Sequence, residues 1–286
     1  MNFSNPKADV YTPDGAAPGL ALRRTTHLCV VAHQDDIEVV AHSGIAACYG
    51  RTDRFFTGVV VTNGAGSSRT GRYAAFTDDQ MQAVRRDEQR RAAVIGKYNL
   101  QIQLAHSSAD VKKPGHAGVA ADLAAIFGAA RPEVVYLHNP ADKHDTHVAV
   151  FLRCLAALRA LPREQRPRRV LGCEGWRNLD WLLDTDKVVL DDSQRPELAG
   201  PLLAVFDSQI SGGKRYDLAV AGRRAANATF LNSHQSDTMA AATWAMDLTP
   251  LVENEELPVR EYTLAYVERL RADIAARLEK FGGGAT

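Results

Sequence analysis

The feature that most constrains the fold of this chain is a regular alternation of short apolar runs with longer helical segments. Residues 27–32 (HLCVVA) and 55–62 (FFTGVVVT) are apolar and β-branched, and the segment 37–49 between them has helical spacing and stops at Gly50. Short apolar runs that end in polar turn residues are typical of buried strands, and glycine often follows the last residue of a helix. The pattern therefore predicts a βαβ unit, which places the two strands in parallel.

The same alternation continues along most of the chain and sets the expected fold class. Further strands are predicted over 100–104, 133–137, 170–173 and 187–190, and further helices over 78–95, 118–130, 146–161, 197–206, 216–230 and 258–281. We expect an α/β fold, a Rossmann-like three-layer sandwich with a mostly parallel sheet and C-terminal helical additions. The expected domains are an N-terminal extension over 1–25 and a single α/β domain over 26–286, in which 165–286 is a C-terminal elaboration.

Charge and composition exclude several classes of protein. The chain has 34 basic and 34 acidic residues, so no overall field attracts nucleic acid or an anionic membrane surface. No apolar stretch approaches the ~20 residues that a membrane-spanning helix needs. Because the N-terminal residues also lack the order of a signal peptide, we expect a cytoplasmic protein whose four cysteines are buried free thiols.

Two polar clusters follow predicted strands and carry the chemistry. One reads His-Gln-Asp-Asp after the first strand, and the other reads His-Asp-Thr-His after the strand that ends at 137. Ligands of a parallel α/β sheet collect at the carboxyl ends of its strands, and catalytic zinc takes three imidazole or carboxylate ligands with one position left open. His33, Asp36 and His147 therefore form the expected metal site, which leaves Asp35 and His144 free for proton transfer.

Each cluster has an ordinary structural interpretation when it is taken alone. A single H-x-x-H pair is weak evidence for a metal, and paired aspartates after a strand often cap a helix. Their joint placement at the carboxyl ends of two predicted strands favours the metal site.

The two clusters resemble the signatures of the PIG-L/LmbE-like zinc-dependent de-N-acetylases, which are N-acetylglucosaminyl deacetylase-like enzymes. After the first strand the chain reads AHQDDIE, similar to the family's A-H-P-D-D-E, with Gln34 in place of proline and Ile37 before the glutamate. Residues 140–147 (PADKHDTH) are similar to the second signature, with Thr146 where many members carry an acid. The resemblance covers about residues 26–150.

The resemblance implies a hydrolase that removes an N-acetyl group from an amino sugar or amino-sugar conjugate by means of metal-activated water. It assigns Zn²⁺, or Fe²⁺ in its place, to His33, Asp36 and His147, and the role of general base to Asp35. A protonated His144 would stabilise the oxyanion and then protonate the leaving amine. A helix cap is the alternative role for His144.

Substrate contacts are less closely defined by the sequence. The resemblance suggests that Arg85 reaches the substrate, although a solvated helix face with i, i+4 pairs explains this residue equally well. Arg72 lies in a polar loop after the second strand, next to a turn that begins at Asn63, and both are expected to contact the substrate. Asp110 is expected either to contact a sugar hydroxyl or to cap a loop.

Two features further along the chain leave alternatives open. Trp176 would supply an aromatic wall for a sugar ring or pack in the core. The basic, glycine-interrupted stretch 206–234 would bind an anionic substrate group or form a subunit interface, and the sequence does not choose between them.

The expected partner is a small N-acetylated sugar or sugar conjugate, with no nucleic acid and no membrane, in a chain that forms a homo-oligomer. The competing interpretation is a catalytically silent carbohydrate-binding protein of the same fold, against which Asp35 and His144 argue. A nucleotide-binding Rossmann protein is disfavoured because the glycine fingerprint is missing.

Overall fold

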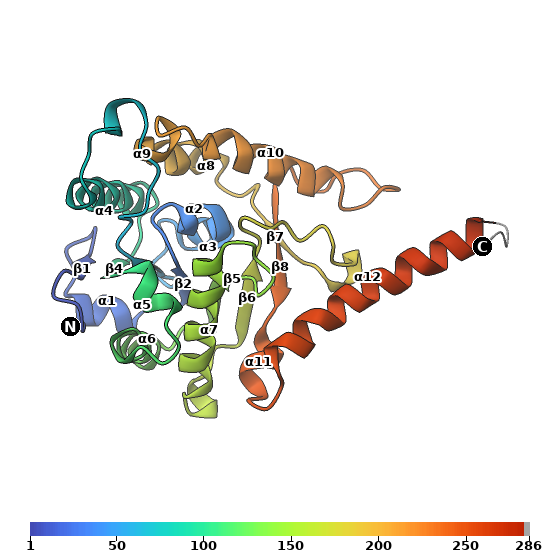
Figure 1. The fold of residues 1–286 in the computed structure, drawn as a ribbon, viewed down its shortest axis with the longest axis horizontal. Coiled ribbons are helices and arrows are strands. Elements are labelled where there is room, and N and C mark those ends of the chain that lie inside the picture. Colours follow the sequence, from blue (N-terminus) through green and yellow to red (C-terminus); the bar gives the residue numbers. More distant parts are fainter. Residues whose placement is uncertain (283–286) are drawn as a thin grey trace.

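A single eight-stranded sheet organises the protein, and helices cover both of its faces (Figure 1). The computed structural model describes residues 1–282, and the sheet has the order β1-β4-β3-β2-β5-β6-β8-β7. The strands β4, β3, β2, β5 and β6 are parallel, and β1, β8 and β7 pair antiparallel at the two edges. The strand bounds are β1 (Asp9–Tyr11), β2 (His27–Val31), β3 (Phe56–Thr62), β4 (Leu100–His106), β5 (Val134–His138), β6 (Arg169–Cys173), β7 (Val188–Asp191) and β8 (Ala242–Asp247).

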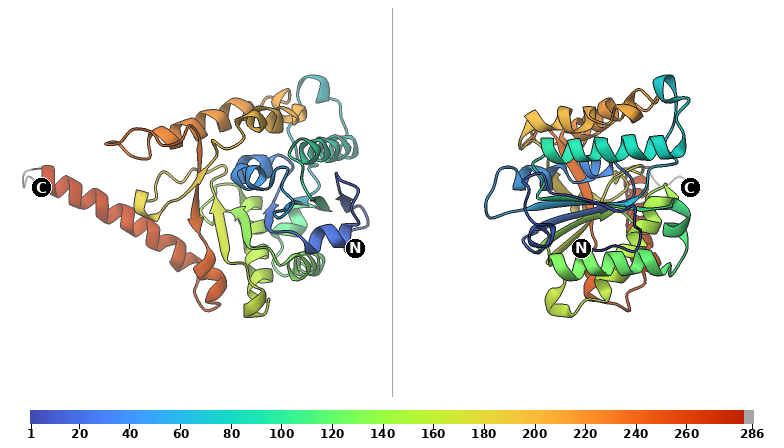
Figure 2. Two further views of the ribbon diagram at one scale, coloured as in Figure 1. Left: turned by 180° about the vertical axis from the view of Figure 1, so that it is seen from behind. Right: turned by 90° about the vertical axis from the view of Figure 1, so that its left-hand side faces the viewer.

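The helices form two layers, one on each face of the sheet (Figure 2). Helices α1, α6, α7 and α11 pack on one face, and α2, α3, α4 and α8 pack on the other. The helix bounds are α1 (Pro18–Arg23), α2 (Asp36–Val40), α3 (His42–Cys48), α4 (Asp78–Ile95), α5 (Ser108–Lys112), α6 (Ala117–Ala130), α7 (Asp145–Arg159), α8 (Pro196–Ala204), α9 (Asp207–Ile210), α10 (Tyr216–Thr229), α11 (Thr249–Glu253) and α12 (Val259–Phe281).

Strand β2 shows why an unbroken apolar run folds in the centre of such a sheet. All five of its residues are buried, with Leu28 and Val30 in the core on the α7 side and Cys29 and Val31 in the core on the α4 side. Successive side chains of a strand point to opposite faces, so a strand covered on both faces is apolar along most of its length. The predicted three-layer α/β class is confirmed.

The structure differs from the sequence-based expectation at one helix and at two strands. The helix predicted over 37–49 is broken at Ala41, whose backbone leaves the helical region (φ −128°, ψ 27°), so that α2 and α3 are separate. Strands β1 and β8 were not predicted, and β8 is inserted antiparallel between β6 and β7. Residues 9–11 thus join the sheet, while the division into an extension over 1–25 and a domain over 26–286, whose last four residues lie outside the described part, stays a prediction.

The C-terminal helix α12 projects away from the body of the protein (Figure 1). Tyr266 is its one buried residue, and Leu264, Val267, Ile274, Leu278 and Phe281 are exposed. Within residues 1–282, no helix is both long enough and apolar enough to cross a membrane.

Candidate active site

A cavity of about 680 Å³ lies at the carboxyl ends of the parallel strands. Its walls come from the turn after β2, the loop after β3, the start of α7, the connection after β6 and the beginning of α10. This volume is in the range of cavities that hold a small-molecule ligand. The lining includes His33, Asp35, Asp36, Thr62, Gly64, Arg85, Lys112, Lys143, His144, His147, Gly175, Trp176, Lys214, Tyr216 and Arg223.

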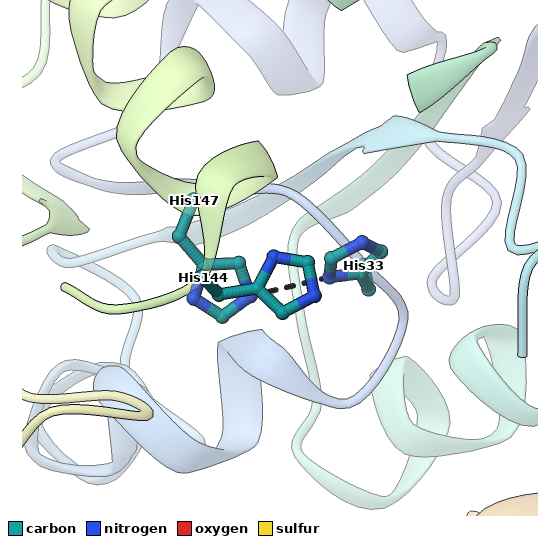
Figure 3. Close-up of side chains that lie close together, drawn as sticks. All are labelled: His33, His144 and His147. Carbon is teal, nitrogen blue, oxygen red and sulfur yellow. Dashed lines mark hydrogen bonds between the residues drawn. The ribbon is translucent and has the colours of Figure 1, made fainter. Parts of the chain in front are cut away.

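Three side chains predicted to bind a metal meet in this cavity with their donor atoms facing one another. The Nδ1 atom of His33 lies 3.2 Å from Oδ2 of Asp36 and 3.2 Å from Nε2 of His147. The third side of the triangle, from Nε2 of His147 to Oδ2 of Asp36, measures 3.3 Å. Figure 3 shows the two imidazoles approaching each other from the turn after β2 and from the first turn of α7.

The dimensions of this triangle fit a shared divalent cation. Tetrahedral zinc with bonds of about 2.0–2.2 Å places neighbouring ligand atoms about 3.3–3.6 Å apart. Two imidazole nitrogens and one carboxylate oxygen are also the donor set of a catalytic zinc site and of a non-haem ferrous site. The geometry therefore fits both metals that the sequence suggested and does not choose between them.

Asp142 orients His147 from behind, a role that sequence reasoning missed. The Nδ1 atom of His147 donates to Oδ2 of Asp142 at 3.1 Å, which leaves the Nε2 lone pair facing the cavity. Although burial acts to raise the pKa of Asp142, the hydrogen bond from His147 and the charge of its ring hold it below the usual range. The available signal was the aspartate five residues before His147 in the second motif.

His138 lies behind the triangle of His33, Asp36 and His147, which we call the metal triangle, and its Nε2 atom already accepts a hydrogen bond. Its ring stacks on that of His147, with centroids 3.8 Å apart, and its Nε2 atom lies 3.6 Å from Oδ2 of Asp36. The same Nε2 atom accepts a hydrogen bond from the backbone N–H of Ala32 at 2.9 Å. Burial, followed by the charge of His147, lowers the pKa of His138 well below its usual value. His138 is therefore a neutral residue that packs behind the ligands.

Asp35 occupies a strained turn that separates its carboxylate from that of Asp36. Its φ is 85°, in the left-handed region that residues other than glycine seldom adopt, and its backbone N–H donates to Oε1 of Gln89 at 3.1 Å. Its Oδ2 atom lies 3.3 Å from Nη2 of the buried Arg85. Burial raises the pKa of Asp35 to about 6, although Arg85 acts in the opposite direction. The carboxylate of Asp35 thus faces Arg85, whereas the adjacent carboxylate of Asp36 faces the two histidines of the triangle.

His144 both caps α7 and lines the cavity. Its Nδ1 atom accepts from the backbone N–H of Thr146 at 3.3 Å, and its ring stacks on that of His147 with centroids 4.5 Å apart. Burial, followed by the charges of His147 and His33, lowers the pKa of His144. An imidazole whose Nδ1 atom accepts carries its proton on Nε2. The arrangement indicates a neutral hydrogen-bond donor where the sequence suggested an imidazolium.

The structure brings one of the four expected substrate-contacting residues to the cavity. Arg85 lines it, whereas Arg72 pairs with Asp207 outside it. The Oδ1 atom of Asn63 accepts from the backbone of its own turn. Asp110 accepts a hydrogen bond from Oγ of Ser107 at 2.6 Å in the capping box of α5. This corresponds to the capping role that the sequence left open for Asp110.

Fold and site together define an α/β protein with a His-Asp-His centre at the carboxyl ends of its parallel strands. Residues 28–158 match the model of the PIG-L family, described as GlcNAc-PI de-N-acetylase. The matched part of the chain contains all three expected metal ligands. The resemblance inferred from the two motifs is confirmed.

Solved structures share the fold at low sequence identity. A conserved protein of Thermus thermophilus is 17% identical, with a TM-score of 0.59 over 82% of this chain and 99% of its own. The N,N'-diacetylchitobiose deacetylase of Pyrococcus horikoshii is 16% identical, with a TM-score of 0.58 over 78% and 84%. The 4-carboxy-2-hydroxymuconate hydratase of Pseudomonas putida is 17% identical, with a TM-score of 0.57 over 78% and 96%.

These likenesses establish the fold and not the reaction, because a deacetylase and a hydratase are both among them. No curated protein sequence matches the chain.

Proposed function

We propose that this protein is a metal-dependent hydrolase that removes an N-acetyl group from an amino sugar or an amino-sugar conjugate. The observation that carries the proposal is the triangle formed by His33, Asp36 and His147, with sides of 3.2, 3.2 and 3.3 Å, beside the separate carboxylate of Asp35. The family description of residues 28–158 as a de-N-acetylase supports the type of reaction. Zinc and ferrous iron are the two candidate ions.

In the proposed mechanism, the metal ligands and the proton acceptor are different residues. His33, Asp36 and His147 would hold the ion, which when bound supplies Lewis-acid activation of a water and of the amide carbonyl. Asp35 would accept the proton of the attacking water, because it lines the same cavity and Arg85 and Gln89 hold it in place. It would then return that proton to the leaving amine.

His144 would stabilise the negative charge that develops on the carbonyl oxygen. Its Nε2–H is a donor fixed by the hydrogen bond at Nδ1 and by stacking on His147. A preorganised donor of this kind typically contributes about 10²-fold or more to the rate of such reactions.

The proposal is tested by measuring amine release from a panel of N-acetylated sugars, with a chelator added and then with Zn²⁺ or Fe²⁺ restored. Asp35→Asn should lower the turnover number by about 10²-fold or more while the bound metal stays near one ion per chain. Asp79→Asn, an exposed carboxylate on α4, is the matched control. Loss of the metal in Asp35→Asn would show that this residue is a ligand.

The same assay separates the alternatives. A metal-loaded protein that binds N-acetylated sugars and releases no amine would be the silent carbohydrate-binding protein, which the family match does not favour. The cytoplasmic location and the homo-oligomer stay predictions.

A further inference from the structure

One wall of the cavity is formed by residues that lie outside the segment matched to the family. It consists of Trp176, from the connection after β6, and of Lys214, Tyr216 and Arg223, from the first eight residues of α10 and the residues before it. We call these four residues the α10 wall. Figure 1 shows α10 lying across the top of the sheet, over the side on which α2 and α4 pack.

The α10 wall is continuous with the metal triangle. The ring of Trp176 lies 6.1 Å from that of His144, centroid to centroid, and 6.2 Å from the ring of Tyr216 in an edge-to-face arrangement. The Nζ atom of Lys214 lies 5.2 Å from the centroid of the Trp176 ring, and Arg223 donates to the carbonyl of Gly175. A ligand whose amide lies between the metal and His144 therefore extends along an aromatic ring towards two cations.

Within the described part of the chain, four of the five cations that line this cavity have no carboxylate partner, whereas the fifth, Arg85, pairs with Asp35. Among residues 1–282, no carboxylate oxygen lies within 4.0 Å of Lys214 or Arg223, nor of two further lining residues, Lys112 and Lys143. Arg215, which follows Lys214 in the chain, is paired with Asp217 at 2.7 Å. Five cations thus line the cavity against the two carboxylates of Asp35 and Asp36, in a chain with no net charge overall.

We propose that the α10 wall binds an anionic group, a carboxylate or a phosphate, on the part of the substrate that is not the acetyl group. This inference rests on the proposed function and gives its substrate class. Arg223 offers a planar fork suited to either anion, Lys214 offers a second charge, and the face of Trp176 is suited to a sugar ring. The basic stretch 206–234 is thereby assigned to an anionic ligand and not to a subunit interface.

Steady-state kinetics test the proposal with neutral and anionic substrates of the same core. The probes are N-acetylglucosamine, its 1-phosphate and 6-phosphate, and N-acetylmuramic acid as the carboxylate. We expect at least one anionic probe to have a KM about tenfold or more below that of the neutral sugar. In Lys214→Ala/Arg223→Ala this advantage should disappear, so that the KM values of the anionic and neutral probes agree within about threefold.

A matched control and a binding measurement make the result specific. Lys113→Ala removes an exposed lysine that does not line the cavity and should leave all four KM values unchanged. Calorimetric titration with the same probes, in the holoprotein and after chelation, should show an anion preference that survives removal of the metal and is lost in the double variant. Preference for phosphate or for carboxylate identifies which anion the wall takes.

The outcomes separate this inference from the proposed function. Amine release with equal KM values for neutral and anionic probes would overturn the inference and leave the deacetylase intact. No amine release from any probe, with anion binding that requires Lys214 and Arg223, would overturn the proposed reaction and support the anion site. If the double variant changes only the oligomeric state, the stretch 206–234 is a subunit interface and the inference is wrong.

Discussion

Replacement of Asp142 by asparagine tests whether the metal triangle depends on the residue behind it. The carboxylate of Asp142 accepts four hydrogen bonds, two on each oxygen. His147 Nδ1 and the backbone N–H of Trp176 donate to Oδ2, and the backbone N–H groups of His144 and Arg177 donate to Oδ1, at 3.1–3.3 Å. Every partner is a donor, so an amide nitrogen in either position faces two N–H groups that it cannot satisfy.

The size of the effect follows from this count. An amide nitrogen that faces His144 and Arg177 leaves two part-buried N–H groups without an acceptor, which at about 1–2 kcal/mol each predicts a loss of about 2–4 kcal/mol in the free energy of unfolding. If the amide nitrogen faces His147, the imidazole must take the tautomer that carries its proton on Nε2 and cannot ligate a metal. Loss of such a supporting carboxylate typically lowers metal affinity by about 10–100-fold.

Both quantities are measurable on the same protein. Metal affinity is obtained by competition with a chromogenic chelator, and the free energy of unfolding by urea denaturation in the presence of a chelator. Asp145→Asn, an exposed residue in the first turn of the same helix, should lose no more than about 0.5 kcal/mol and keep its metal affinity. Metal affinity within twofold of wild type in Asp142→Asn would refute the assignment of Asp142 to the support of His147.

Two further predictions concern residues away from the reacting groups. Burial, with help from Arg224, lowers the pKa of His42 to about 4, so between about pH 6.5 and pH 4 the unfolded chain binds a proton that the folded protein does not. The free energy of unfolding should therefore fall by about 3 kcal/mol from pH 7 to pH 4, and His42→Gln should remove that part of the slope in urea titrations; an unchanged slope would contradict this. Gly175→Ala places a methyl group 2.6 Å from Oδ2 of Asp142 and should lower metal affinity about tenfold in the chelator competition, whereas Gly200→Ala, with open space around the added methyl group, should not. Equal affinities in the two alanine variants would show that Asp142 can move without consequence.

The part of the site that the sequence predicted is the part that follows from sheet topology. His33 follows β2 and His147 begins the helix after β5, and β2 and β5 are neighbours in the sheet. Parallel strands end at the same edge, so two clusters 114 positions apart meet once the alternation of strands and helices is recognised. The same alternation predicted the class of the fold.

The parts that escaped prediction depend on side-chain direction and on distant packing. Asn63 lies in a turn and Asp110 in α5, both near the carboxyl ends of the strands, but each makes its hydrogen bonds locally, and hydrophobic periodicity does not reveal this. Strand β8 was missed because its partners, β6 and β7, precede it by more than 50 residues and it pairs with both in the antiparallel direction. The α10 wall was not predicted because α10 lies outside both motifs, and only the folded structure packs it against the cavity.

The separation of the cavity into two sides has a consequence for how such a protein changes its specificity. The side that carries Asp35 is held by buried groups, such as Arg85 and Gln89, that support its strained turn. The α10 wall is built from exposed and half-buried side chains of the connection after β6 and of α10 with the residues before it, and Lys214 and its neighbours can be exchanged without disturbing that turn. If both proposals hold, selection or engineering can retune ligand preference at the α10 wall and leave the turn at Asp35 unchanged.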